Sequence, residues 1–253
     1  FFHSFSQATI TKTIGASGDY PSITAAWASI PGIESPITQP WIFELKSDYN
    51  IGSETFPINL TAISGASATN TITIRPQIGV TALTITTAAA ASALKLNGAD
   101  YVIIDGRPGG SGISELTIEN SQTANLKYAI HLTADATYNT IQYCTVKGSS
   151  YATTSVQNAS VICIDEGNAS TNCDNTTITN CTITKSGANK PACLIGIARN
   201  TTEIMLDNLT ISNNNLVDFA LSGINSPWKV SVLSITGNSF YQITTLGDLP
   251  NIA

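Results

Sequence analysis

The segment "NTTITNCTIT", from Asn175 to Thr184, decides how this chain folds. It is built almost entirely from Asn, Thr and Ile, and neither a helical period of 3.6 nor simple strand alternation describes it. Its apolar positions are Ile178, Cys181 and Ile183. The two residues between the first pair break the alternation of a single strand. Two short strand segments joined by a bend explain this break, with all three apolar positions facing inward.

The same pattern, Ile-x-x-[Cys/Asn]-x-apolar, occurs four times in the second half of the chain. At spacings of 37, 33 and 24 residues, the copies begin at Ile141, Ile178, Ile211 and Ile235. Recurrence at a period of about 20 to 50 residues is typical of solenoids, whose stacked coils share one core. We expect Asn214 and Asn238 to stack with Cys181 in an inward ladder, where amides bond to their neighbours.

A second apolar phrase accompanies each copy of the repeat. It reads "AIHL", "VICI", "LIGI" and "LSGI", and begins at Ala129, Val161, Leu194 and Leu221. Alignment of these phrases predicts one outward column of His131, Cys163, Gly196 and Gly223. It predicts a second outward column of Thr133, Asp165, Ala198 and Asn225. Glu166 is then expected beside Arg199 on the next coil.

The first hundred residues are less regular but fit the same plan. The segments "TITIRP", "LTITT", "ALKL" and "YVIIDG" are short, rich in β-formers and about ten residues apart. Ahead of them, "YPSITAAWASI" has an apolar face at i, i+3, i+4 and i+7, formed by Ile23, Ala26, Trp27 and Ile30. This face predicts a helix over about 20–30, with Pro21 in its first turn. We expect the helix to cap the open end of the solenoid core.

Composition limits the function classes that are open to the chain. Only 11% of its 253 residues are charged, compared with about 25% in ordinary soluble domains. The net charge of -6 leaves no basic surface for nucleic acid, and no apolar run is long enough for a membrane-spanning helix. We therefore expect neither nucleic-acid binding nor membrane insertion.

The five cysteines do not form a recognisable disulfide framework or zinc site. Their count is odd, their spacing is irregular and no CxxC pair occurs. We expect Cys144 and Cys181 to be small buried residues of the core. A surface pair involving Cys173 stays open.

The sequence predicts one domain and an exported protein. Residues 1–8, "FFHSFSQA", are interpreted as the remnant of a signal peptide, and residues 9–253 as a single β-helix domain. A buried first strand is the other interpretation of the opening residues. The C-terminal end, "TTLGDLPNIA", has no segment that resembles the N-terminal helix. We expect the natural protein to continue into further C-terminal domains.

At this level the chain resembles a right-handed parallel β-helix of the pectin-lyase-like kind, as found in large secreted or cell-surface proteins of Bacteroidetes type. The resemblance is carried by "GDYPSITAAW", "FPINLTAISGASATNTITIRP", "LKLNGADYVIIDGRPGG", "LTIEN", "NTIQYCTVKG" and "ITGNSFYQ", which cover most of residues 15–245. It implies an all-β fold, export and attachment to the cell surface. It does not imply an activity, because this fold carries adhesins as well as enzymes.

The known enzymes of this fold carry catalytic phrases that are absent here. No DD, G-H-G or R-I-K phrase of the hydrolases occurs, and no W-x-D-H or R-x-P-x-x-R phrase of the lyases. Asp105 and Arg107 in "DGRPGG" are better explained as an ion pair that holds a turn. The remaining catalytic candidates are His131, Asp165 and Glu166, which could act as acid and base or form a salt bridge beside a solvated histidine.

Binding residues are harder to select than catalytic ones. Trp41 and Trp228 are candidates for stacking on sugar rings, although a Trp near a turn can equally cover the edge of a core. No cofactor or metal site is expected. The sequence therefore favours a structural or adhesive module that binds a polysaccharide or another surface protein, with a polysaccharide lyase or glycoside hydrolase as the alternative.

Overall fold

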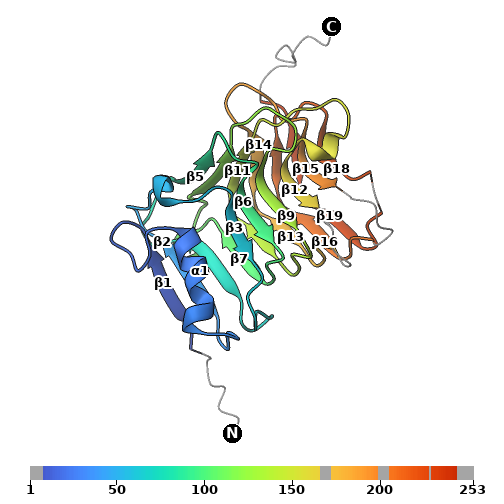
Figure 1. Cartoon of the computed structure of the whole chain (residues 1–253). Helices are drawn as coiled ribbons and strands as arrows, with labels where there is room; N and C mark the ends of the chain where they lie inside the picture. Colours follow the sequence, from blue (N-terminus) through green and yellow to red (C-terminus); the bar gives the residue numbers. More distant parts are fainter. Residues whose placement is uncertain (1–7, 166–171, 199–204, 228, 244–253) are drawn as a thin grey trace.

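The computed structural model describes residues 8–165, 172–198, 205–227 and 229–243. They form a parallel β-solenoid with one α-helix, α1, and three sheets that run along its length (Figure 1). We refer to the eight-stranded sheet as sheet A and to the two six-stranded sheets as sheets B and C. Since each full coil gives one strand to each sheet, the solenoid has about six coils.

The strands of each sheet are parallel to their neighbours and follow one another in chain order. Sheet A contains β1 (Ile10–Ile14), β2 (Trp41–Leu45), β4 (Ile72–Pro76), β7 (Val102–Asp105), β10 (Thr140–Gln142), β13 (Thr177–Thr179), β16 (Leu209–Ser212) and β19 (Leu233–Thr236). Sheet B contains β3 (Ile58–Thr61), β6 (Ser92–Asn97), β9 (Tyr128–Thr133), β12 (Ser160–Asp165), β15 (Cys193–Ala198) and β18 (Ser222–Asn225). Sheet C contains β5 (Leu83–Thr87), β8 (Leu116–Asn120), β11 (Thr145–Gly148), β14 (Thr182–Lys185), β17 (Asn215–Val217) and β20 (Ser239–Tyr241).

The register of the stack confirms the repeat predicted from the sequence. In sheet A, each of Ile141, Ile178, Ile211 and Ile235 lies opposite the next. In sheet C, the same holds for Val146, Ile183, Leu216 and Phe240. A shift of one residue would turn every apolar side chain outward, so the buried face fixes this register.

The inward ladder at the bend between sheets A and C is also confirmed. Asn214 donates from Nδ2 to the carbonyl of Ile178 (2.9 Å) and to Oδ1 of Asn238 (2.9 Å), and its own Oδ1 accepts from the backbone N–H of Cys181 (2.8 Å). Asn238 repeats the pattern by donating to the carbonyl of Ile211 (2.7 Å). Each amide therefore satisfies backbone groups at a bend where the sheet hydrogen bonds are interrupted.

The predicted outward columns of sheet B are correct for three coils and wrong for the fourth. His131 lies opposite Cys163, and Cys163 lies opposite Gly196. The next partner of Gly196 is Asn225, and the predicted Gly223 lies two residues earlier. Asn225 consequently does not follow Ala198 in the second column. The error arose because "LIGI" and "LSGI" match as text, whereas the register aligns Ile195 with Ile224.

Helix α1 (Ile23–Ile33) buries the apolar face that the sequence predicts. The predicted range of about 20–30 is displaced, because Ser22 is the N-cap and accepts from the backbone N–H of Ala25. Pro21 therefore precedes the helix, while Pro31 lies within its last turn. The indole of Trp27 donates to the carbonyl of Thr61 in β3 (3.2 Å), which holds the helix against sheet B.

Three short 3-10 helices complete the described elements: η1 (Ile51–Ser53), η2 (Pro108–Gly110) and η3 (Val156–Asn158). All five cysteines are buried and free. The surface pair involving Cys173 is therefore absent, and its thiol instead donates to the carbonyl of Asp165 (3.2 Å). Residues 1–7, which carry most of the predicted signal remnant, lie outside the described residues.

Candidate functional site

The outer face of sheet B brings two of the three catalytic candidates together. His131 on β9 and Asp165 on β12 approach to 3.4 Å between Nε2 and Oδ2. The two side chains are 16% and 29% exposed, so solvent reaches both. Glu166 and its expected neighbour Arg199 lie outside the described residues. The site contains one long histidine–carboxylate contact, with no second carboxylate placed opposite it among the residues described.

The thiol nearest to His131 on the outer face of sheet B is buried, and therefore a substrate cannot reach it. Cys163 lies directly opposite His131 but is fully buried, in a small cluster with Tyr128 and Ala198. Segment η3 packs over β15, and a Cβ on Gly196 would meet the carbonyl oxygen of Gln157 at 2.1 Å. The glycine therefore allows the covering segment to approach the sheet.

Burial sets the protonation of the groups around His131. Desolvation raises the pKa of the Cys163 thiol well above its ordinary value, and the nearby carboxylate of Asp165 adds to the shift. Desolvation likewise raises the pKa of the Tyr128 hydroxyl. A thiol nucleophile needs the opposite shift, so this arrangement is a packed patch beside a histidine–carboxylate contact and not an activated Cys–His pair.

The two tryptophan candidates have different outcomes. Trp41 is 0% exposed, and its indole donates to Oε2 of Glu34 (3.0 Å) while its ring packs at 6.0 Å from Phe43. A fully buried ring offers no face to a sugar, so Trp41 is a residue of the core. Trp41 lies in strand β2, which pairs with β1 and β4, and not near a turn. Trp228 lies outside the described residues.

The ion pair predicted for "DGRPGG" is present. Arg107 donates from Nε and Nη2 to the two carboxylate oxygens of Asp105, at 2.9 and 2.7 Å. Gln142 on the next coil donates to the same carboxylate (2.9 Å), and the guanidinium carbon of Arg107 lies 3.8 Å from the ring centre of Tyr143. Asp105 is thus fully engaged in holding the turn and one neighbouring coil.

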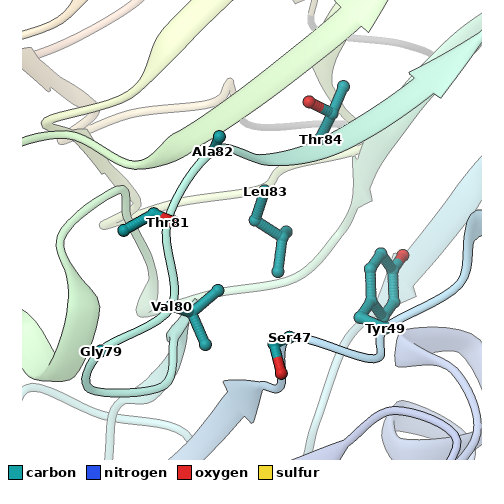
Figure 2. A pocket seen from close by; sticks show the side chains of 8 residues that line it. All are labelled: Ser47, Tyr49, Gly79, Val80, Thr81, Ala82, Leu83 and Thr84. Carbon is teal, nitrogen blue, oxygen red and sulfur yellow. The ribbon is translucent and has the colours of Figure 1, made fainter.

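A hollow of about 250 Å³ lies beside β5, the first strand of sheet C (Figure 2). It is bounded by Ser47 and Tyr49 on one side and by the segment from Gly79 to Thr84 on the other. It exists because the chain after β2 forms η1 instead of a strand of sheet C. The hydroxyl of Tyr49 already donates to Glu54 (2.8 Å), and the volume is below that of most ligand pockets. No pattern in the sequence indicates this hollow.

Two columns of left-handed residues border the outer face of sheet A, and the sequence analysis missed both. On the side toward sheet B, the residues with positive φ are Tyr101, Tyr138, Asn175 and Asn208, at 55°, 56°, 55° and 53°. On the side toward sheet C they are Tyr143, Asn180, Asn213 and Gly237, at 51°, 54°, 56° and 65°. Backbone N–H groups in both columns bond to carbonyls of the next coil, as Tyr138 does to Asp174 (2.9 Å) and Tyr143 to Thr179 (3.2 Å).

The tyrosines of these columns are partly exposed and have ordered neighbours. Tyr138 is 48% exposed and stacks on Tyr101 with ring centres 4.6 Å apart and planes 4° apart. Beyond Tyr138, the amide of Asn208 donates to that of Asn175 (3.1 Å). Alignment of "YVII", "YNTI", "NTTI" and "NLTI" on their last Ile would have found this column.

Among the described residues, no group of three or more His, Cys, Asp or Glu side chains could hold a metal ion. No helix in that part of the chain is both long and apolar enough to cross a bilayer. Comparison with known proteins found no matching family model, no matching curated protein and no matching solved structure.

Proposed function

We propose that this chain is a secreted or cell-surface β-helix module with a structural and adhesive role, which binds a polysaccharide or another surface protein. The observation that carries the proposal is the chemistry of the outer face of sheet A. On β10, β13 and β16 its outward positions are hydroxyl and amide side chains without any ionisable group: Thr140, Gln142, Thr177, Thr179, Thr210 and Ser212. Such a surface suits an extended hydroxyl-rich partner and offers little to catalysis.

The finer features of the fold belong to the same proposal. The three-sheet parallel arrangement supports the proposal of a right-handed helix of the pectin-lyase-like kind. The Bacteroidetes type and export by a signal peptide are proposed from the sequence resemblance and from residues 1–8 alone. The contacts of α1 with β1 and β3 support its role as the cap of the solenoid core. A cap of this kind prevents other strands from adding to the open end of a stack.

A polysaccharide lyase or glycoside hydrolase remains the second candidate function, and the contact between His131 and Asp165 favours it. A catalytic pair of carboxyl groups needs a fixed separation across the scissile bond. The described residues supply Asp165 to such a pair, and Glu166 is the other carboxylate that the sequence offers. The covered thiol and the long 3.4 Å contact argue for a structural role of this pair.

One experiment distinguishes the two functions. The purified chain is incubated with a panel of plant and algal polysaccharides, and retained binding is measured together with new reducing ends and unsaturated uronates. We expect binding without cleavage. Product release that is lost in Asp165→Asn would replace the adhesive proposal by the enzymatic one, and the absence of both binding and release would leave a stalk that contacts proteins only.

A further inference from the structure

We propose that the outer face of sheet A between its two left-handed columns is the binding site for an uncharged polysaccharide. The site, called the tray below, has a floor of outward side chains on β10, β13 and β16. Tyr138 and Tyr143 flank β10, the first of these three strands in chain order, and so form two corners of the tray. This inference rests on the proposed function, because it assigns the adhesive role to one face and one class of glycan.

The backbone of the two tyrosines is the first observation. A bulky residue with positive φ is an outlier, whereas Asn and Gly occupy this region at low cost. The following coils have Asn or Gly at the equivalent positions, so the turn itself does not require an aromatic residue. Costly conformations of this kind concentrate at functional sites. Both Tyr138 and Tyr143 therefore need a reason beyond the fold.

The direction of the rings is the second observation. Tyr138 is covered by the ring of Tyr101 and Tyr143 by the guanidinium of Arg107, and both covering groups belong to the preceding coil. The other face of each ring is therefore the one turned toward the next coil, where the column continues with the shorter Asn175 and Asn180. The apolar C–H face of a sugar ring packs well on the electron-rich face of an aromatic ring.

The floor between the corners is suited to a flat chain of hydroxyl groups. Tyr143 follows Tyr138 by five positions, which span roughly 16 Å at most if the chain is extended. Thr179 and Ser212 are hydrogen bonded to each other (2.9 Å), and Asn180 donates to the hydroxyl of Thr179 (3.0 Å). These bonds hold the floor in a fixed array before any ligand arrives, which lowers the entropic cost of binding.

The charges around the tray select against acidic polysaccharides. Asp105 and Arg107 neutralise each other beside Tyr143. On the side toward sheet B, Asp174 and Asp207 precede the two asparagines of the column, and Asp174 accepts from the backbone N–H of Asp207 (2.7 Å). Burial, and after it the nearby charge of Asp207, raises the pKa of Asp174. Among the described residues, neither carboxylate takes part in a salt bridge. A neutral glycan avoids the repulsion that a polyuronide would meet there.

The test measures binding of the whole chain to neutral probes, cellohexaose, xylohexaose and mannohexaose, and to an acidic probe, oligogalacturonate, by titration calorimetry. The variants are Tyr138→Asn and Tyr143→Asn, which place at each corner the residue that the next coil already has there. Each substitution is expected to weaken binding of a neutral probe about tenfold, since an aromatic contact is lost. Tyr241→Asn is the matched control, because Tyr241 is 42% exposed on β20 of sheet C.

The outcomes separate the tray from the proposed function. Neutral binding that weakens in both corner variants and persists in the control supports the tray. Neutral binding that is unchanged in Tyr138→Asn and Tyr143→Asn overturns the tray and leaves glycan adhesion intact. Binding of oligogalacturonate alone also overturns it. Binding of no glycan removes the polysaccharide part of the proposed function and the tray with it. Circular dichroism of each variant verifies that it is folded.

Discussion

The outer faces of sheets A and B are built on the same coils but have opposite properties. On sheet B, the segment around η3 lies on β15, and Cys163, Cys193 and Ser160 are all 0% exposed. On sheet A, the outward side chains of β10, β13 and β16 remain partly exposed between two columns of left-handed residues. At β12 and β15, sheet B is therefore buried on both faces over nearly its whole strand length, as a parallel strand in a layered fold would be. Sheet A on the same coils has one buried face and one face that solvent reaches.

A sequence repeat restrains the residues inside a solenoid and leaves those on its outer faces free to vary. Every coil must fill the same core, so its inward residues are restrained to a few apolar types. The outer face is restrained only where a longer connection folds back over it. A search for function on such a protein should therefore begin with the faces that no connection covers.

The largest expected losses of stability come from substitutions in the core, where sheets A and B should behave alike. Ile178 in sheet A and Ile195 in sheet B are both 0% exposed. Changing either to Ala should lower the free energy of unfolding by about 2 to 5 kcal/mol, because it removes buried methyl groups and leaves a cavity. Urea denaturation measures the loss. Thr177→Ala, on the outer face beside Ile178, should cost under about 1 kcal/mol. Equal losses for Thr177 and Ile178 would contradict the assignment of inside and outside.

The next prediction concerns a substitution that displaces the segment around η3 from the outer face of sheet B. A methyl group at Gly196 would overlap the carbonyl oxygen of Gln157, so Gly196→Ala should displace the segment around η3 and cost about 1 to 3 kcal/mol. Displacement should also make Cys163 react with a thiol reagent at pH 8, whereas burial raises the pKa of the Cys163 and Cys193 thiols in the native protein, to about 11 for Cys193. Mass spectrometry identifies the labelled cysteine.

Gly32→Ala provides the control for this labelling experiment. A Cβ at Gly32 meets no atom within 4 Å, and Ala favours the helix in which this glycine lies. Labelling of the five thiols should then stay as slow as in the native chain. Rapid labelling of native Cys163 would show that sheet B is not covered in solution.

A smaller effect concerns the backbone of the tray. Tyr138→Asn and Tyr138→Ala both remove the ring and its stacking on Tyr101, but only Asn tolerates the left-handed conformation well. The Asn variant should therefore be more stable than the Ala variant by about 1 kcal/mol in urea denaturation. Equal stability of the two would mean that position 138 leaves the left-handed region when the ring is absent. The strain argument for the tray would then be lost.

The smallest effect is a pH dependence at the corner between sheets B and A. Burial, and then the charge of Asp207, raises the pKa of Asp174 above its ordinary value of 3.8. A raised pKa in the folded state gives stability that is present below 3.8 and is lost as the pH rises through the folded value. Asp174→Asn should consequently raise the melting temperature slightly at pH 7 and leave it unchanged at pH 3, because the amide oxygen can still accept from the N–H of Asp207.

Asp19 gives the contrast of opposite sign. Hydrogen bonds from the backbone and hydroxyl of Thr13 lower the pKa of Asp19, so its contribution to stability is present above 3.8 and lost as the pH falls. Asp19→Asn should therefore lower the melting temperature at pH 7. A shift in the same direction for both variants would show that overall charge, and not these local contacts, decides the result.

Much of the fold was predictable because each coil carries the same short pattern of apolar and Cys or Asn residues. The positions of Ile141, Ile178, Ile211 and Ile235 fixed the register of sheet A, and Asn214 and Asn238 marked the inward ladder. The prediction was wrong where two phrases matched as text but not in register, at Gly223. The catalytic candidates His131 and Asp165 were correctly placed side by side. Trp41 was not a binding residue, because an aromatic residue in a strand of this stack can face the core.

The sequence by itself determined the period, the inward residues and the polar character of the outside, because the apolar face of each coil must meet the apolar face of the next. Only the tertiary structure decided which outer face is covered. The segment around η3 reaches β15 through contacts between residues far apart in the chain, and no periodicity encodes them. The tertiary structure also decided the direction of Tyr138 and Tyr143, since a left-handed backbone turns a side chain to a place that strand alternation does not predict.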